Sequence, residues 1–172
     1  MTESSVEREI DRKEIGLYVH IPYCLSRCPY CDFNTYAVRT WPEEYYAEAL
    51  NHELAGYAGR EPFRGRRVAT IFFGGGTPSL FRPGTIASLD RSGRAPPRSR
   101  RERRDHARGK SRHRRAGEPR GLRAAGVNRL SLGVQSFDDA SLAKLGRHHS
   151  AADSLAALDA ARARASRTSR ST

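Results

Sequence analysis

The chain has 172 residues, three of them cysteine, and a formal net charge of +12 at pH 7. This length suits one domain, and no run approaches the roughly 18 apolar residues that a membrane-spanning helix needs. Nothing at the N-terminus looks like a signal peptide, and three cysteines cannot all pair with one another. An extracellular disulfide-bonded protein is therefore disfavoured, and we expect a cytoplasmic protein with reduced thiols.

The positive charge is concentrated in two stretches. Residues 90–115 hold 12 Lys or Arg against 3 Asp or Glu, a net +9, and residues 162–172 add +4, which leaves the rest near −1. The only residues from the apolar set in the first stretch are Ala95 and Ala107. Such a stretch cannot bury enough surface to offset the entropy of ordering it. We therefore expect residues 90–115 to be disordered, and residues 1–13 to be a flexible tail.

The first predicted element is a buried strand over residues 17–21. The loop after it contains all three cysteines, Cys24, Cys28 and Cys31, in the pattern C-x3-C-x2-C. Three thiolates on one short loop can bind three corners of a cubic iron–sulfur cluster, which usually has four cysteine ligands. One iron would then lack a protein ligand, so that a small molecule could bind there.

Two other interpretations of the cysteines are a structural zinc site and three unconnected thiols. A structural zinc site usually has four ligands, commonly in C-x2-C pairs. His20 would be the fourth ligand, but it belongs to the predicted strand and is expected to face away from the loop. The iron–sulfur cluster is therefore the favoured interpretation.

A parallel βαβ unit is predicted around this loop. Pro42 and the acidic residues after it suit the start of a helix, and Gly59 suits its C-cap. A second strand over residues 68–73 runs into the glycine-rich residues 74–78, and strand, helix, strand in this order predicts a parallel sheet. Glycines at the end of a parallel strand allow close backbone approach to a ligand, although a glycine triplet alone also suits a tight turn. The next helix is predicted within residues 79–89.

The second half contains a similar series of elements. Residues 121–126 end a helix with a glycine cap, and residues 127–135 form a predicted strand. Asp138 or Asp139 then caps a short helix, and Ser150 caps the last one. A strand between these two halves would complete the pattern of a parallel α/β fold, but residues 90–115 contain none by composition.

The motif YVHIPYC-x3-CPYCDFN resembles the radical S-adenosylmethionine (SAM) superfamily, whose signature has an aromatic residue, here Tyr30, before the last cysteine. Its flanks resemble the oxygen-independent coproporphyrinogen oxidase family, and within it the haem-chaperone (HemW-like) branch. True oxidases have a further cysteine where this chain has Phe33, which favours the chaperone over the enzyme. The resemblance implies an α/β fold in which residues 14–162 form the N-terminal part of a parallel (β/α) partial barrel.

The resemblance also implies cofactors and partners. A [4Fe–4S] cluster on the three cysteines would bind SAM at its open iron, and one electron would cleave SAM to methionine and a 5′-deoxyadenosyl radical. The implied partners are an electron donor, haem or a porphyrin, and haem-receiving proteins, with the haem-binding motif expected beyond residue 172. The residues that match family contacts to SAM are Tyr18, Tyr30, Gly75, Gly76, Thr77, Gln135 and Arg147.

The two basic stretches can be interpreted as frameshifted sequence. Codons for residues 105–115 can be chosen so that dropping one base gives Ile-Thr-Leu-Glu-Ala-Asn-Pro-Gly-Thr-Val, which resembles the family strand with a SAM-binding glutamate. Residues 163–172, read two bases on, can give Ala-Gly-Phe-Glu-Asp-Val-Glu-Val-Asp. We therefore predict one compensated frameshift, and a second, uncorrected one with a premature stop.

Two alternatives of another class remain at this point. The chain could be an arginine-rich nucleic-acid-binding protein, but residues 90–115 lack the interleaved aromatic residues on which bases stack. It could also be a non-functional fragment, because loss of one strand would break the sheet and the SAM pocket.

Overall fold

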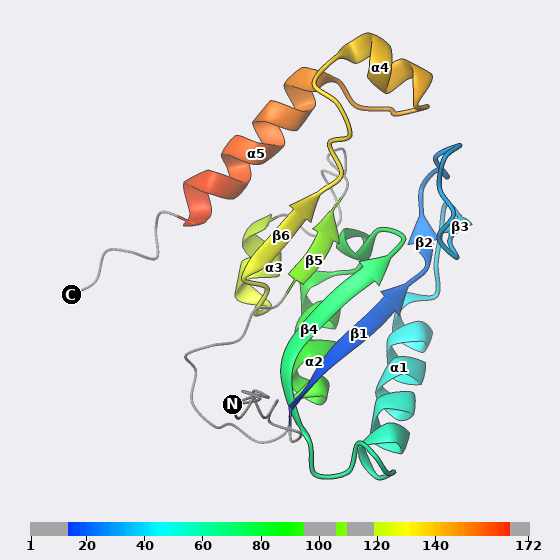
Figure 1. The fold of residues 1–172 in the computed structure, drawn as a ribbon, viewed down its shortest axis with the longest axis vertical. Helices are drawn as coiled ribbons and strands as arrows, with labels where there is room; N and C mark the ends of the chain where they lie inside the picture. The colour runs from blue at the N-terminus through cyan, green and yellow to red at the C-terminus, as the bar shows by residue number, and fades with distance from the viewer. Residues whose placement is uncertain (1–13, 95–105, 110–118, 166–172) are drawn as a thin grey trace, which may run out of the picture.

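The computed structural model describes residues 14–94, 106–109 and 119–165. It is an α/β fold with a four-stranded parallel sheet in the order β1-β4-β5-β6 (Figure 1). The strands are β1 (Glu14–Ile21), β4 (Arg67–Gly75), β5 (His106–Gly109) and β6 (Arg129–Leu132), with a short parallel pair β2 (Tyr23–Cys24) and β3 (Tyr36–Ala37).

Three helices cover one face of the sheet (Figure 1). They are α1 (Glu43–Ala58), α2 (Pro83–Gly93) and α3 (Pro119–Ala124), and a 3-10 turn, η1 (Pro78–Leu80), precedes α2. Two more helices, α4 (Asp139–Lys144) and α5 (Ala151–Ala165), follow β6. In the part of the chain that the structure describes, none of the helices is long and apolar enough to cross a membrane.

The core lies between the sheet and these helices. Ile21 of β1 and Phe73 of β4 are fully buried, and they belong to one apolar cluster with Ile86 of α2 and Leu122 of α3. The parallel pairing of β1 with β4, and the helix between them, confirm the predicted βαβ unit.

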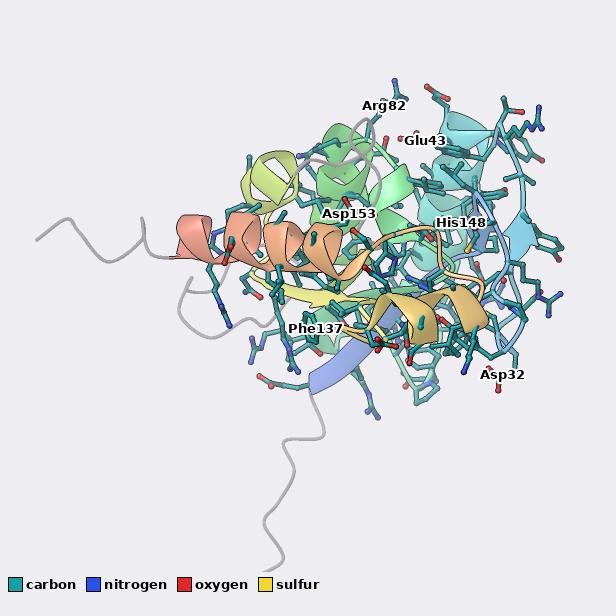
Figure 2. All side chains as sticks on the ribbon, turned by 90° about the horizontal axis from the view of Figure 1, so that it is seen from above. Asp32, Glu43, Arg82, Phe137, His148 and Asp153 are labelled. Carbon is teal, nitrogen blue, oxygen red and sulfur yellow. The ribbon has the colours of Figure 1, made fainter. Side chains whose placement is uncertain are left out.

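Polar contacts join the first two helices. The Glu43 carboxylate at the start of α1 accepts hydrogen bonds from the Arg82 backbone N–H at 2.8 Å and from the Thr85 hydroxyl at 2.6 Å. Figure 2 shows Glu43 and Arg82 where α1 and α2 meet. A buried carboxylate thus serves an N–H group at the start of α2, where helical N–H groups lack partners within the helix.

The predicted caps agree with the structure. Asp138 caps α4 by accepting from the Ser141 backbone N–H at 2.7 Å. Ser150 and Asp153 exchange hydrogen bonds at the start of α5, as a capping box does. Gly59 is the C-cap of α1.

The predicted disorder over residues 90–115 is wrong in two places. Helix α2 continues to Gly93, because Leu89 and Asp90 are buried and the Asp90 carboxylate pairs with Arg94. Strand β5 lies between β4 and β6, where its backbone groups can form a ladder whatever the polarity of its side chains. The rest of the prediction lies outside the described residues.

Two further expectations differ from the structure. Helix α5 extends to Ala165, so disorder does not begin at residue 163; the predicted tails over residues 1–13 and 166–172 lie outside the described residues. Strand β6 ends at Leu132 rather than at residue 135, because the Leu132 carbonyl accepts from the Val134 N–H in a tight turn.

Candidate functional site

The cysteine loop, residues 22–34, follows the carboxyl end of β1. All four strands of the sheet run the same way, and β2, β3 and α4 lie beyond their carboxyl ends (Figure 1). This is the edge at which open parallel sheets bind ligands.

The three cysteines differ in burial. Cys24 and Cys28 are buried, Cys31 is partly exposed, and none of them is in a disulfide. Among the described residues, no three His, Cys, Asp or Glu side chains converge as the ligands of a single metal ion would. Three thiols on one loop are a donor set that a cubic iron–sulfur cluster can use, because cysteine thiolates bind its irons.

The glycine turn, residues 74–78, lies directly against the start of the cysteine loop. The Gly76 N–H donates to the Ile21 carbonyl at 2.7 Å, and the Thr77 N–H donates to the Tyr23 carbonyl at 2.9 Å. A Cβ at Gly76 would lie 2.5 Å from the Tyr23 carbonyl oxygen, so this position needs glycine. The buried Thr77 hydroxyl donates to the Cys24 sulfur at 3.5 Å. The glycine turn therefore contacts Cys24, one of the candidate cluster ligands.

A tyrosine–histidine pair lies beside this turn. Tyr18 is 51% exposed and stacks on Phe72, with ring centroids 5.6 Å apart. His20 Nε2 lies 3.0 Å from the Asn34 carbonyl, and its Nδ1 lies 3.0 Å from the Tyr18 hydroxyl. A carbonyl only accepts, so Nε2 carries the proton and the tyrosine donates to Nδ1.

His20 was expected to face away from the loop, but its side chain contacts the loop. Its side chain closes the loop by holding the Asn34 carbonyl, and its ring covers Gly75, where a Cβ would meet the imidazole at 2.6 Å. Gly75 has a φ of 93°, a conformation that favours glycine. The expectation was wrong because the Asn34 carbonyl, 14 residues away, is a hydrogen-bond partner for the His20 ring.

The end of α4 directs a charged side chain toward the cysteine loop. Gly146 has a φ of 63°, its N–H donates to the Ala143 carbonyl at 2.9 Å, and the Arg147 N–H donates to the Leu142 carbonyl at 2.9 Å. These two bonds form a Schellman motif, in which glycine ends the helix. The Leu-Gly-Arg sequence thus turns the chain sharply and places Arg147 just after the turn.

Arg147 connects three parts of the site. Its Nη1 donates to the Cys28 sulfur at 3.0 Å and lies 3.5 Å from the Tyr30 hydroxyl, and its Nη2 donates to the Gly133 carbonyl at 2.7 Å. Its Nε is buried and has no hydrogen-bond partner among the described residues. Burial, with a hydrogen bond to the Cys28 sulfur, raises the pKa of the Tyr30 phenol, and the Arg147 charge opposes that shift.

Gln135 is exposed and follows β6 with a φ of 69°, a left-handed conformation that is uncommon for a residue other than glycine. Figure 2 views this end of the molecule, with α4 in front and Phe137 and His148 on the segments that enter and leave it. The structure thus brings Tyr30 and Arg147 to Cys28, and Thr77 to Cys24, while Tyr18 and Gly75 meet at His20.

Known proteins resemble this chain over most of its length. The heme chaperone HemW of Haemophilus influenzae is 36% identical over 151 residues, which cover 86% of this chain and 39% of the relative. The mitochondrial radical S-adenosyl methionine domain-containing protein 1 of Mus musculus is 40% identical over 166 residues, which cover 86% of this chain and 33% of the relative. The chain spans about a third of the length of these relatives.

A solved structure and a family model agree with these relatives. The structure of coproporphyrinogen III oxidase (HemN) from Escherichia coli, a radical SAM enzyme, matches with a TM-score of 0.74 and 30% identity, over 87% of this chain and 34% of the other. The model of the radical SAM superfamily matches residues 18–172. Family membership implies a [4Fe–4S] cluster and SAM as cofactors. The chain belongs to the radical SAM superfamily.

Proposed function

We propose that Cys24, Cys28 and Cys31 bind a [4Fe–4S] cluster whose open iron takes SAM, in a protein that binds and transfers haem as a haem chaperone does. The arrangement of the cysteine loop carries the proposal. Two of its sulfurs accept hydrogen bonds, from Thr77 and from Arg147, at the carboxyl edge of a parallel sheet. Donors to sulfur are a principal way in which a protein orients and tunes a cluster.

The remaining residues of the site would serve SAM. The backbone of Gly75, Gly76 and Thr77 offers a surface that a small molecule can approach closely. Tyr18 of β1 and Tyr30 of the cysteine loop present partly exposed rings, and Gln135 follows the carboxyl end of β6. A bound cluster supplies single electrons to SAM, and the protein's part is to position both cofactors and exclude water.

The haem-related part of the proposal comes from the relatives. A protein named heme chaperone matches over 86% of this chain, and Phe33 stands where an oxidase would have a further cysteine. The proposed partners are haem, haem-receiving proteins and an electron donor, in a cytoplasmic setting. We also propose that the sheet is the first part of a partial barrel.

A second candidate function is oxidation of coproporphyrinogen III. The observation that favours it is the likeness to the oxidase structure, at a TM-score of 0.74. Phe33 argues against it, because the candidate site then has three cysteines rather than four.

The two functions can be separated with one preparation. The chain would be reconstituted anaerobically with iron and sulfide, titrated with haem by absorbance, and then mixed with a haem-free acceptor protein. A separate sample would receive coproporphyrinogen III, SAM and a reductant. Haem binding and transfer without conversion of the porphyrinogen would support the chaperone function, and conversion would favour the oxidase instead.

Matched variants identify the ligands. Cys28→Ser should lose most of its iron and sulfide, whereas Leu25→Ala, an exposed change in the same loop, should retain both. Equal iron content in the two variants would contradict the assignment of the cysteines as ligands.

A further inference from the structure

Two side chains from the α4–α5 connection hold the backbone that follows β6. Arg147 Nη2 donates to the Gly133 carbonyl at 2.7 Å, and His149 Nε2 donates to the Val134 carbonyl at 3.0 Å. These are consecutive carbonyls, immediately before Gln135. His149 is only 6% exposed. Because a carbonyl can only accept, its Nε2 carries the proton of this hydrogen bond.

The segment that they hold has an unusual conformation. Strand β6 ends in a tight turn, with the Val134 N–H donating to the Leu132 carbonyl at 3.0 Å, and Gln135 follows with a φ of 69°. A non-glycine residue keeps such a conformation only where its surroundings determine it, and such residues cluster at functional sites. Here the two side-chain contacts on the preceding carbonyls supply that constraint.

His149 is itself rigidly placed. It lies between the glycine cap of α4 at Gly146 and the capping box of α5, in which the Ser150 N–H donates to the Asp153 carboxylate at 2.9 Å. The same connection carries Arg147, which also reaches the Cys28 sulfur. One short segment therefore contacts both a candidate cluster ligand and the turn that leads into Gln135.

We propose that His149 is a positioning residue of the SAM site, which acts through the Val134 carbonyl to hold Gln135 in its left-handed conformation. The inference rests on the proposed binding of SAM at the cluster. The Nε2 of His149 is engaged by the Val134 carbonyl, whereas Arg147 contacts the Cys28 sulfur. The result of the clamp is a Gln135 backbone that is ordered before SAM binds.

The test compares His149→Leu, His149→Gln and His148→Leu in the reconstituted full chain. Leucine removes the donor, whereas glutamine can still donate an N–H to the Val134 carbonyl. His148 is the adjacent, exposed histidine and serves as the matched control. For each protein, iron and sulfide are counted, SAM affinity is measured by anaerobic equilibrium dialysis, and the electron paramagnetic resonance (EPR) spectrum of the reduced cluster is recorded with and without SAM.

We expect His149→Leu to retain its cluster, to bind SAM about tenfold more weakly, as loss of a buried hydrogen bond would cause, and to show a smaller change of EPR spectrum on SAM addition. His149→Gln should lie within about twofold of the parent, as glutamine preserves the hydrogen bond, and His148→Leu should match the parent.

Three results would overturn the inference. They are unchanged SAM affinity in His149→Leu, no rescue in His149→Gln, and loss of the cluster together with SAM in His149→Leu, which would make His149 a structural residue. If the parent chain itself fails to assemble a cluster or bind SAM, the proposed function fails instead, so the two failures are distinguishable.

Discussion

Strands β4 and β5 are neighbours in the same sheet, yet their sequences differ in kind. Strand β4 contains Ile71 and Phe73, which are buried in the core, whereas β5 has the sequence His-Ala-Arg-Gly. The apolar residues of β4 favour a buried strand by themselves. The strand conformation of β5 depends instead on backbone pairing with β4 and β6, which lie on either side of it. A similar contrast separates the two halves of the chain. Residues 14–94 contain the βαβ unit that the apolar pattern predicts. In residues 119–165, the cap of α4 places Arg147 in contact with the Cys28 sulfur.

This contrast supports the frameshift proposal. Strand β5 occupies residues 106–109, and codons for residues 105–109 can be chosen so that the shifted frame gives Ile-Thr-Leu-Glu-Ala. An apolar strand is what the position between β4 and β6 would be expected to contain, since parallel strands are usually apolar. We propose that the natural gene encodes this strand in the shifted frame.

The largest expected effect comes from removing a buried side chain of β4, the strand with the apolar sequence. Phe73→Ala removes a fully buried ring and should lower the free energy of unfolding by about 3–5 kcal/mol. Ala107→Gly in β5 should cost only about 0.5–1 kcal/mol, the usual penalty of glycine in a strand. Urea unfolding would measure both, and equal losses would contradict the contrast between the strands.

Replacing residues 105–109 with Ile-Thr-Leu-Glu-Ala should make β5 an apolar strand like β4. Added apolar and β-branched side chains should raise the free energy of unfolding by about 2–4 kcal/mol. The order Thr-Ile-Glu-Leu-Ala serves as the control, because it keeps the composition while Ile and Leu move to the opposite face of the strand. Resequencing of the locus would test the proposal directly, and an unshifted frame with no gain in stability would contradict it.

Gly146 ends α4 and places Arg147 beside the cysteine loop. Gly146→Ala places a Cβ 3.0 Å from Pro29 of the cysteine loop, at a φ of 63°. The left-handed conformation alone should cost about 1–2 kcal/mol. Gly56→Ala, where nothing lies within 4 Å of the added Cβ, should instead stabilise α1 by about 0.5–1 kcal/mol. Thermal unfolding distinguishes the two, and a gain at Gly146 would show that its conformation is not needed.

The smallest effect concerns the cap of α4. Hydrogen bonds from Ser141, through its side chain and then its backbone, lower the pKa of Asp138 from its ordinary value of 3.8. A lowered folded-state pKa contributes stability above pH 3.8, and this contribution is lost as the pH falls through the folded value. Asp138→Asn accepts hydrogen bonds without titrating. The Tm difference between parent and variant should stay constant near neutrality and shrink in acid; a constant difference throughout would contradict the cap.

Local patterns predicted the cysteine loop, the parallel βαβ unit and the caps at Asp138 and Ser150, because each of these depends on residues close together in the sequence. The contact between Arg147 and Cys28 joins residues 119 positions apart, and only the family resemblance placed Arg147 near the site. The direction of His20 and the backbone of Gln135 depend on partners in other segments, so no local pattern could have predicted them.

The central claim is that this chain holds a cluster with an open iron that binds SAM. The most direct measurement is the EPR spectrum of the anaerobically reconstituted and reduced chain, recorded before and after SAM is added. We predict a cluster signal that is absent in Cys28→Ser and that changes when SAM binds. A chain that retains no iron, or a cluster signal that SAM leaves unchanged, would contradict the account.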